Sequence, residues 1–178
     1  INNGEKLILL TVHRRENWGQ NLINILKAVE ILVEKYKDLK FIIPMHKNKN
    51  IRDVIKDKLS NNAKVILSEP LPYDQFVYVL DNVYLILTDS GGIQEEAPSF
   101  SKPVLVLRET TEREEALKKG TALLIGTKTI NILKNVSTLI ENSNSYQIMT
   151  NRGNPFGDGN ACERILNMCI EFLKEKDS

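Results

Sequence analysis

Short apolar runs alternate with longer amphipathic segments along the chain. Residues 6–12 (KLILLTV) are apolar at nearly every position, whereas residues 20–37 place apolar side chains three or four positions apart. The first pattern predicts a strand buried on both faces, and the second predicts a helix with one apolar side. Further strands are predicted at 41–44, 64–67, 84–88, 103–107 and 122–125, and further helices at 51–59, 73–82, 129–142 and 160–176.

Apolar strands that alternate with helices predict the fold class α/β, with a doubly wound, Rossmann-like parallel sheet of about six strands. In such sheets ligands bind at the carboxyl ends of the strands. Polar residues follow four of the predicted strands, at 13–17, 45–47, 89–92 and 108–113. We expect these segments to lie along one rim of the sheet and to form a ligand site.

Composition narrows the class of protein. The 178 residues are 42% hydrophobic and 26% charged, which is typical of one soluble globular domain. The 24 basic and 23 acidic side chains give a net charge of +1, so no bulk field would attract nucleic acid or an anionic membrane. No apolar run approaches the roughly 20 residues of a membrane span.

Two features concern the location and the extent of the chain. Cys162 and Cys169 lie in one predicted helix, which places their Cα atoms on the order of 10 Å apart, too far for a disulfide. This spacing favours a reducing, cytoplasmic location. The chain begins at Ile1 with a strand close behind, from which we expect further sequence upstream.

The segment 89–92 (DSGG) follows a predicted strand and opens a helix-compatible stretch. Paired glycines at such a turn let the backbone approach a ligand closely, and the N–H groups at a helix start attract phosphate. Glu95 or Glu96, about one turn further on, can reach a hydroxyl group beside that phosphate. Phosphate plus hydroxyl indicates a nucleotide, and plain turn chemistry with Ser90 as the helix N-cap is the alternative.

Other polar residues at the rim have a functional and a structural interpretation. His13 can bind a phosphate oxygen or transfer a proton, or it can lie in a solvated loop. Arg113 can pair with a diphosphate, or it can be satisfied by the acidic residues of 112–115. His46 is by default a surface histidine. Phe76 can stack on a base, but its spacing is also typical of a core position.

Several well-known motifs are absent. The sequence has no GxGxxG fingerprint, no metal-ligand spacing, no Walker-A run and no Ser-His-Asp order. Nothing in the segment 89–98 requires a metal. The acidic pairs alone do not identify a general acid and base.

Taken together, these motifs resemble the non-hydrolysing UDP-N-acetylglucosamine 2-epimerase family. The motifs that carry the resemblance occur in the family's order and spacing. They are TVHRREN (11–17), PMHKN (44–48), LTDSGGIQEEAPSFSKPVLVLRETTER (87–113), the GT pairs at 120–121 and 126–127, and NPFGDGNACERI (154–165).

The resemblance implies a domain organisation and a reaction. The family has two Rossmann-like domains in the glycosyltransferase-B arrangement, with a UDP-sugar in the cleft between them. Residues 1–178 would be the carboxyl-terminal, UDP-binding domain with its last helix, and the N-terminal domain would be absent from this chain. In the family, anti elimination of UDP gives 2-acetamidoglucal, and re-addition of UDP yields UDP-N-acetylmannosamine without nicotinamide or metal.

The resemblance also implies roles for residues of the glycine turn and the first strand end. His13 matches the family histidine at the diphosphate, which is important for catalysis. Ser90, Gly91 and Gly92 match the turn that holds the phosphates through backbone N–H groups. Glu96 matches the ribose-binding carboxylate.

Five further positions match the family's nucleotide and effector sites. Arg113 matches the arginine that completes the UDP site. Phe76 matches the position against the uracil, and Leu71 the position of a backbone contact to the base. Arg14 and His46 fall where bacterial members bind a second UDP-sugar as an allosteric activator.

The sequence departs from the family at two points. Glu114 replaces the proline that usually follows Thr-Glu-Arg, which we expect to loosen that loop while leaving Arg113 intact. The carboxylates that handle the C2 proton belong to the N-terminal domain. We therefore predict that this chain binds UDP weakly and epimerises nothing alone.

Three other functions fit the same motifs. They are a hydrolysing UDP-N-acetylglucosamine 2-epimerase, a glycosyltransferase-B type glycosyltransferase, and a non-enzymatic UDP-sugar sensor. The partners implied are a UDP-sugar and the missing domain. Family members are typically homodimers, so we expect a homodimer for the full-length protein.

Overall fold

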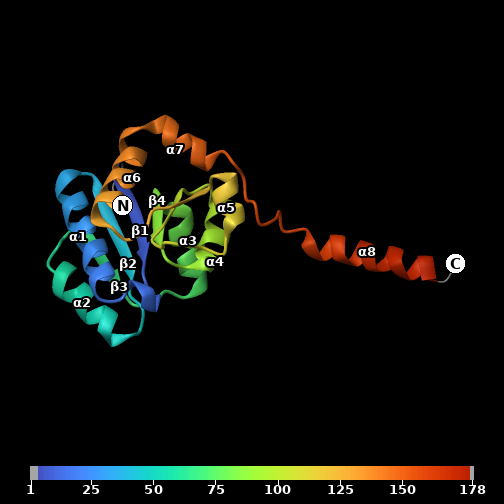
Figure 1. Cartoon of the computed structure of the whole chain (residues 1–178), viewed down its shortest axis with the longest axis horizontal. Helices are drawn as coiled ribbons and strands as arrows, with labels where there is room; N and C mark the ends of the chain where they lie inside the picture. Colours follow the sequence, from blue (N-terminus) through green and yellow to red (C-terminus); the bar gives the residue numbers. More distant parts are fainter. Residues whose placement is uncertain (1–3, 177–178) are drawn as a thin grey trace.

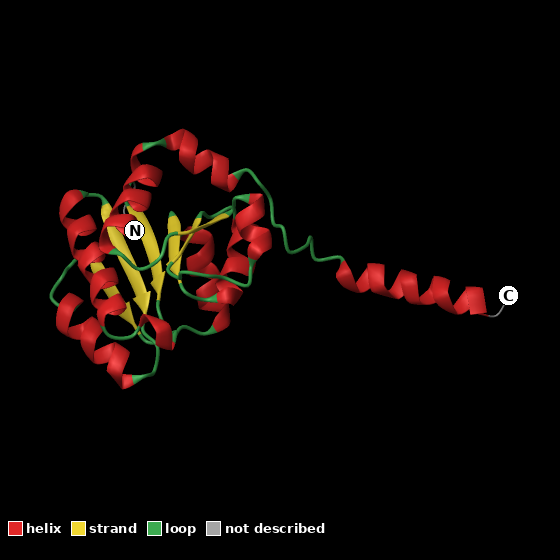
Figure 2. Cartoon of the chain, viewed as in Figure 1, coloured by secondary structure: helices red, strands yellow, loops and turns green. Residues whose placement is uncertain are grey.

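The computed structural model describes residues 4–176, in which one parallel sheet lies between helices on both faces (Figures 1 and 2). The strands are β1 (Lys6–Thr11), β2 (Leu39–Pro44), β3 (Val65–Ser68), β4 (Leu85–Thr88), β5 (Val104–Val106) and β6 (Ala122–Leu124). The α-helices are α1 (Gln20–Lys35), α2 (Lys49–Leu59), α3 (Tyr73–Asn82), α4 (Gly91–Glu96), α5 (Glu114–Lys119), α6 (Thr129–Glu141), α7 (Ser143–Thr150) and α8 (Ala161–Lys176). Short 3-10 helices are η1 (Arg15–Asn17) and η2 (Ala97–Phe100).

The strand order confirms the predicted doubly wound sheet. Among the described residues, the strands are arranged β3-β2-β1-β4-β5-β6, and every neighbouring pair is parallel. The chain therefore winds outward from β1 in one direction and then returns to wind outward from β4 in the other. Thr11 pairs with Thr88, so β1 and β4 end at the same level. The carboxyl end of this β1–β4 junction is the point where such folds bind ligands.

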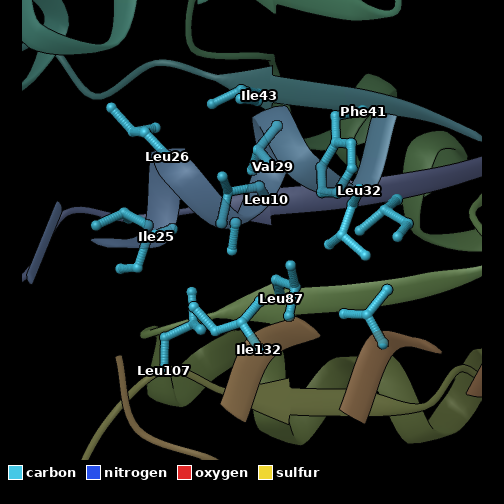
Figure 3. Close-up of a cluster of buried hydrophobic side chains, with 14 of the residues drawn as sticks. Leu10, Ile25, Leu26, Val29, Leu32, Phe41, Ile43, Leu87, Leu107 and Ile132 are labelled. Carbon is cyan, nitrogen blue, oxygen red and sulfur yellow. The ribbon is translucent and has the colours of Figure 1, made fainter. Parts of the chain in front are cut away.

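The apolar strands are buried on both faces, as their sequence predicts. In β1, Ile8 and Leu10 pack into a core cluster with α1, α2 and α6. Leu7 and Leu9, on the opposite face, pack into a second cluster with α3 and α5. Figure 3 shows part of the first cluster, in which side chains of α1 lie near Leu10 and Phe41 of the strands and Ile132 of α6 lies near Leu87. These two layers hold the strand ends, and hence the site, in fixed positions.

Two helices were not predicted from the sequence. Residues 114–119 form α5, with Glu114 and Glu115 in its first turn and Gly120 closing it at φ 76°. Glu114, which replaces the expected proline, begins this helix and pairs with Lys118 at 2.8 Å. The second is α7, which begins directly after α6 ends. Asn142 caps α7, because its side chain accepts a hydrogen bond from the Ser145 N–H at 3.0 Å.

The last helix, α8, extends away from the sheet and its covering helices beyond the loop at 151–160 (Figure 1). Its large apolar side chains are all exposed: Ile165, Leu166, Met168, Ile170, Phe172 and Leu173. Within residues 4–176, none of the helices has both the length and the apolar character that crossing a membrane requires.

Candidate functional site

The loops after β2, β1, β4 and β5 are neighbours at one rim of the sheet, as expected from the sequence. A pocket of about 380 Å³ opens between the first three of them and the start of α3. Its size is within the range of ligand sites, which is about 300–1,000 Å³. Five of the predicted site residues line it: His13, His46, Leu71, Phe76 and Ser90.

Below the pocket lies a buried carboxylate, that of Asp89. Its side chain is 0% exposed. The backbone N–H groups of His13 and Arg14 donate to it at 3.0–3.2 Å, and Nδ2 of Asn17 donates at 2.9 Å. Burial alone would raise the pKa of Asp89, but the hydrogen bonds from His13, Arg14 and Asn17 outweigh it and lower the pKa. Asp89 is therefore a charged group held inside the protein.

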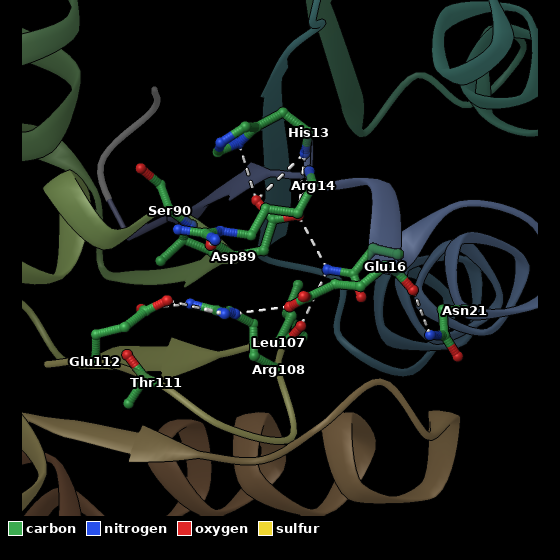
Figure 4. A network of polar contacts seen from close by, with 12 residues as sticks. His13, Arg14, Glu16, Asn21, Asp89, Ser90, Leu107, Arg108, Thr111 and Glu112 are labelled. Atoms are coloured by element: carbon green, nitrogen blue, oxygen red, sulfur yellow. Dashed lines mark hydrogen bonds and ion pairs between the residues drawn. The ribbon is translucent and has the colours of Figure 1, made fainter. Parts of the chain in front are cut away.

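His13 joins this buried carboxylate to the pocket. Its Nδ1 lies 2.9 Å from Oδ1 of Asp89, and its side chain is 40% exposed (Figure 4). The ring stacks against that of His46, with 6.0 Å between centroids. The two histidines thus form one wall of the pocket, and His46 is exposed, as a surface histidine is expected to be.

The glycine turn begins one residue after Asp89. Ser90 occupies the N-cap position of α4, but its side chain makes no capping hydrogen bond, so the structure does not support the plain N-cap interpretation. Instead, the Ser90 N–H donates to Oγ1 of Thr88 at 3.0 Å. In the described part of the chain, no protein oxygen accepts a hydrogen bond from the N–H of Gly91 or Gly92. These amides are available to a ligand.

Arg113 reaches this turn from the loop before α5. Its guanidinium lies against Gly91, where an added β-carbon would come within 3.4 Å of Nη2. Its Nε donates to Oε1 of Glu95. The expected alternative, pairing with the acidic residues of its own loop, is therefore wrong, because the partner comes from α4 across the site.

The two candidate glutamates of α4 have different surroundings. Glu95 pairs with Arg113, whereas Oε2 of Glu96 accepts a hydrogen bond from the Tyr73 hydroxyl at 3.2 Å. The negative charge of Glu96 raises the pKa of Tyr73. Tyr73 starts α3, the helix that also carries Phe76 into the pocket. Glu96 is thus on the side of the site that faces α3.

Two further arginines of the rim, Arg14 and Arg108, are engaged within the protein. Arg14 donates from Nε to the main-chain oxygen of Asp89 at 2.8 Å. Arg108, which is 6% exposed, pairs with Glu16 at 2.7 Å and with Glu112 at 2.8 Å (Figure 4). The hydrogen bond from Arg108 lowers the pKa of Glu112 to about 2. These contacts tie the loop after β5 to the loop after β1.

The sequence does not reveal the contacts of four residues of the site. From the sequence, Glu95 is considered for a ligand hydroxyl, as is Glu96, but not as the partner of Arg113. Asp89 and Asn17 are placed after strand ends without a partner, and Tyr73 is not singled out. The partners of Asp89 lie 72–76 positions away in the sequence, so spacing alone does not reveal them. The available signal was an acidic residue directly after an apolar strand, where burial requires hydrogen-bond partners.

No group of three or more His, Cys, Asp or Glu side chains within residues 4–176 is arranged to hold a metal ion. The polar side chains that line the pocket include those of His13, His46 and Lys47, whereas the amides of residues 91–92 and the guanidinium of Arg113 lie at the adjoining turn, outside the lining. N–H and cationic groups of this kind suit anionic oxygens.

Sequence comparison places these features in a family. A family model described as UDP-N-acetylglucosamine 2-epimerase matches residues 1–170. The UDP-N-acetylglucosamine 2-epimerase of Campylobacter jejuni is 44% identical over 171 residues, which cover 96% of this chain and 45% of that protein. The chain spans about half the length of the curated relatives it matches.

Solved structures with the same fold carry nucleotides. The S. aureus MnaA-UDP co-structure aligns with a TM-score of 0.91 at 47% identity, covering 96% of this chain and 47% of that chain. The UDP-GlcNAc 2-epimerase from Neisseria meningitidis bound to UDP-GlcNAc aligns with a TM-score of 0.91 at 47% identity, covering 96% of this chain and 46% of that chain.

Proposed function

Because the chain belongs to the UDP-N-acetylglucosamine 2-epimerase family, we propose that it supplies the UDP-binding half of a non-hydrolysing epimerase. The observation that carries this proposal is the pocket at the β1–β4 junction, where His13, Ser90 and Phe76 meet. Relatives of the same fold were solved with UDP and with UDP-GlcNAc. The proposed substrate is accordingly a UDP-sugar, with its nucleotide in this pocket.

The diphosphate would lie at the glycine turn. The N–H groups of Gly91 and Gly92 donate to its oxygens, and Arg113 neutralises its charge across Gly91. His13 lies beside the same oxygens at the edge of the pocket. Breakage of the sugar–phosphate bond leaves negative charge on the diphosphate, and these donors stabilise that charge.

The nucleoside would extend from the glycine turn toward α3. Glu96, held by Tyr73, accepts hydrogen bonds from the ribose hydroxyls. Phe76 lies against the uracil, and the backbone of Leu71 contacts the base edge. Both residues line the pocket, which supports an aromatic and backbone site for the base.

In the proposed reaction, anti elimination releases UDP from UDP-N-acetylglucosamine, and UDP then re-adds to give UDP-N-acetylmannosamine. The chain's contribution is to bind UDP through elimination and re-addition and to stabilise it as leaving group. The groups that move the C2 proton would come from the other half of the protein. Alone, the chain would bind UDP and leave the sugar unchanged.

A second, N-terminal domain is part of this proposal, with residues 1–178 as the carboxyl-terminal domain. Two observations support it: the chain matches only about half of each relative, and α8 presents a row of uncovered apolar side chains. The full-length protein would be a homodimer, and Arg14 and His46 would contribute to a second UDP-sugar site. The free thiols of Cys162 and Cys169, both exposed, are consistent with a reducing, cytoplasmic compartment.

Calorimetric titration with UDP tests the nucleotide site. We expect one UDP per chain, and a loss of affinity of at least about tenfold in Glu96→Ala and in Arg113→Ala, because each removes a charged hydrogen-bonding group. Glu163→Ala on exposed α8 is the matched control and should bind UDP as the parent does. Absence of binding by the parent chain, or unchanged affinity in both site variants, would overturn the assignment.

Product analysis of the full-length protein tests the reaction. With UDP-N-acetylglucosamine as substrate, we expect UDP-N-acetylmannosamine. Free N-acetylmannosamine plus UDP would instead identify a hydrolysing enzyme, and sugar transfer to an added acceptor would identify a glycosyltransferase.

A further inference from the structure

The carboxylate of Asp89 is buried below the pocket and is not part of its lining. It is absent from the residues that line the pocket, and its side chain is 0% exposed. A charge buried in this way is costly unless it is fully hydrogen-bonded. Its hydrogen-bond partner in the pocket lining is His13, through both the ring Nδ1 and the backbone N–H.

We propose that Asp89 is a positioning residue that holds the hydrogen of neutral His13 on Nδ1 and so leaves Nε2 as a hydrogen-bond acceptor for a ligand group in the pocket that carries a hydrogen, such as a hydroxyl. This inference rests on the proposed function, since it assigns a chemical state to a residue of the proposed UDP site.

The hydrogen bond between the two side chains fixes the direction of donation. Nδ1 of His13 lies 2.9 Å from Oδ1 of Asp89, and an ionised carboxylate can only accept. Nδ1 must then carry the hydrogen, which leaves the lone pair of the neutral ring on Nε2. Among residues 4–176, no hydrogen bond to Nε2 of His13 is present, so this lone pair is available to a ligand.

His46 is held in the opposite state. The N–H of Asn48 donates to Nδ1 of His46 at 3.2 Å, so Nδ1 is an acceptor and the neutral ring carries its hydrogen on Nε2. The two rings stack at 6.0 Å on one wall of the pocket. In their neutral forms, His13 therefore offers a hydrogen-bond acceptor to a ligand in the pocket, and His46 offers a donor.

The Asp89 carboxylate is itself fixed by the strands. Nδ2 of Asn17 donates both to Oδ2 of Asp89 at 2.9 Å and to the main-chain oxygen of Leu107 at 3.1 Å. Leu107 follows β5, and Asp89 follows β4. Asn17 thus ties the carboxylate to the next strand end, so that the orientation of His13 is set by the sheet rather than by a mobile loop.

The tautomers can be observed directly in the unmodified chain. The sequence contains only two histidines, so long-range ¹H–¹⁵N correlation spectra of histidine-labelled protein show two ring systems, which His46→Gln assigns. At a pH where both rings are neutral, we expect His13 to be protonated on Nδ1 and His46 on Nε2. A proton on Nε2 of His13 would overturn the proposal, and this measurement needs no variant of Asp89.

Asp89→Asn tests whether the carboxylate sets this state. We expect His13 to become a mixture of tautomers while His46 keeps its own. Asp81→Asn, the same change at an exposed position of α3, should alter neither tautomer. An unchanged tautomer of His13 in Asp89→Asn would refute the positioning role.

The two proposals fail separately. If the parent chain does not bind UDP but His13 is protonated on Nδ1, the nucleotide site is refuted and the paired state of Asp89 and His13 stands. If UDP binds and His13 is protonated on Nε2, the nucleotide site stands and the proposed pairing of Asp89 and His13 is refuted.

Discussion

The guanidinium of Arg113 lies directly against Gly91, so that a β-carbon at this position would come within 3.4 Å of Nη2 and 3.5 Å of Cζ. Nothing comparable surrounds Gly92, where the nearest atom to an added β-carbon is Oε1 of Glu96 at 3.8 Å. These are ordinary van der Waals distances, shorter at the first position, so the packing of the protein alone requires glycine at neither. A ligand that lies against the amides would need glycine at both.

Gly92→Ala should consequently raise the free energy of unfolding while it lowers the affinity for UDP. Alanine is the better helix former, so the free energy of unfolding should rise by roughly 0.5–1 kcal/mol. UDP affinity should fall about tenfold, because the methyl group separates the amide from a phosphate oxygen. Urea denaturation and calorimetry measure the two effects. In Gly91→Ala we expect weaker binding without the gain in stability, and full UDP affinity in Gly92→Ala would contradict close approach.

Glu95 competes with a diphosphate for Arg113. The side chains of Glu95 and Arg113 are 43% and 34% exposed, so the ion pair between them is weak, typically below about 1 kcal/mol. A diphosphate can therefore displace Glu95 from Arg113. Glu95→Gln should therefore raise UDP affinity about threefold, because it removes both the competitor and a negative charge. Glu115→Gln, on exposed α5, is the control for the loss of charge. A lower affinity in Glu95→Gln would mean that Glu95 instead holds Arg113 in place.

Tyr73 holds the carboxylate proposed to bind ribose. Loss of its hydroxyl in Tyr73→Phe removes one hydrogen bond to Glu96, which should weaken UDP binding about two- to fivefold. Tyr78→Phe, on the same helix and 70% exposed, should have no effect. Inorganic pyrophosphate has neither ribose nor uracil, so calorimetry should give the same pyrophosphate affinity for the parent and for Tyr73→Phe. A loss of pyrophosphate binding would place the effect of Tyr73 at the phosphates.

The fold could be predicted from the sequence to a larger extent than the site. Residues 73–82 form the predicted helix, and the apolar strands occur where their runs predict them. The missed helix α5 has only six residues, too few for an amphipathic period, although its terminal charges and Gly120 were a signal. The site depends on pairs such as His13 with Asp89 and Arg113 with Glu95. Such pairs form only after the sheet has brought distant strand ends together, so local patterns do not contain them.

The buried charge of Asp89 should make stability depend on acid pH. Its pKa is lowered in the folded protein, so its contribution to stability is complete above the unfolded pKa of about 3.9 and is lost as the pH falls through the folded pKa. Asp89→Asn should lower the free energy of unfolding by about 2–4 kcal/mol at pH 7, because the donors from His13, Arg14 and Asn17 lose a charged acceptor. Urea denaturation at pH 7 and at pH 3 should show a smaller difference in acid. The same difference at both pH values would mean that folding does not shift the pKa of Asp89.

The apolar side chains of α8 should make the isolated chain self-associate. Leu166 and Phe172 are 59% and 57% exposed, and further apolar residues of the helix lie exposed between them. A contiguous apolar surface of this kind on an isolated chain favours association. We expect sedimentation velocity to show oligomers that grow with concentration, and the double variant Leu166→Gln, Phe172→Gln to shift the chain toward monomer. Glu163→Gln, on the same helix, should not.

UDP affinity should be unchanged in the double variant, because α8 extends away from the pocket. A parent chain that stays monomeric at all concentrations would mean that exposure of this face alone is not enough for association.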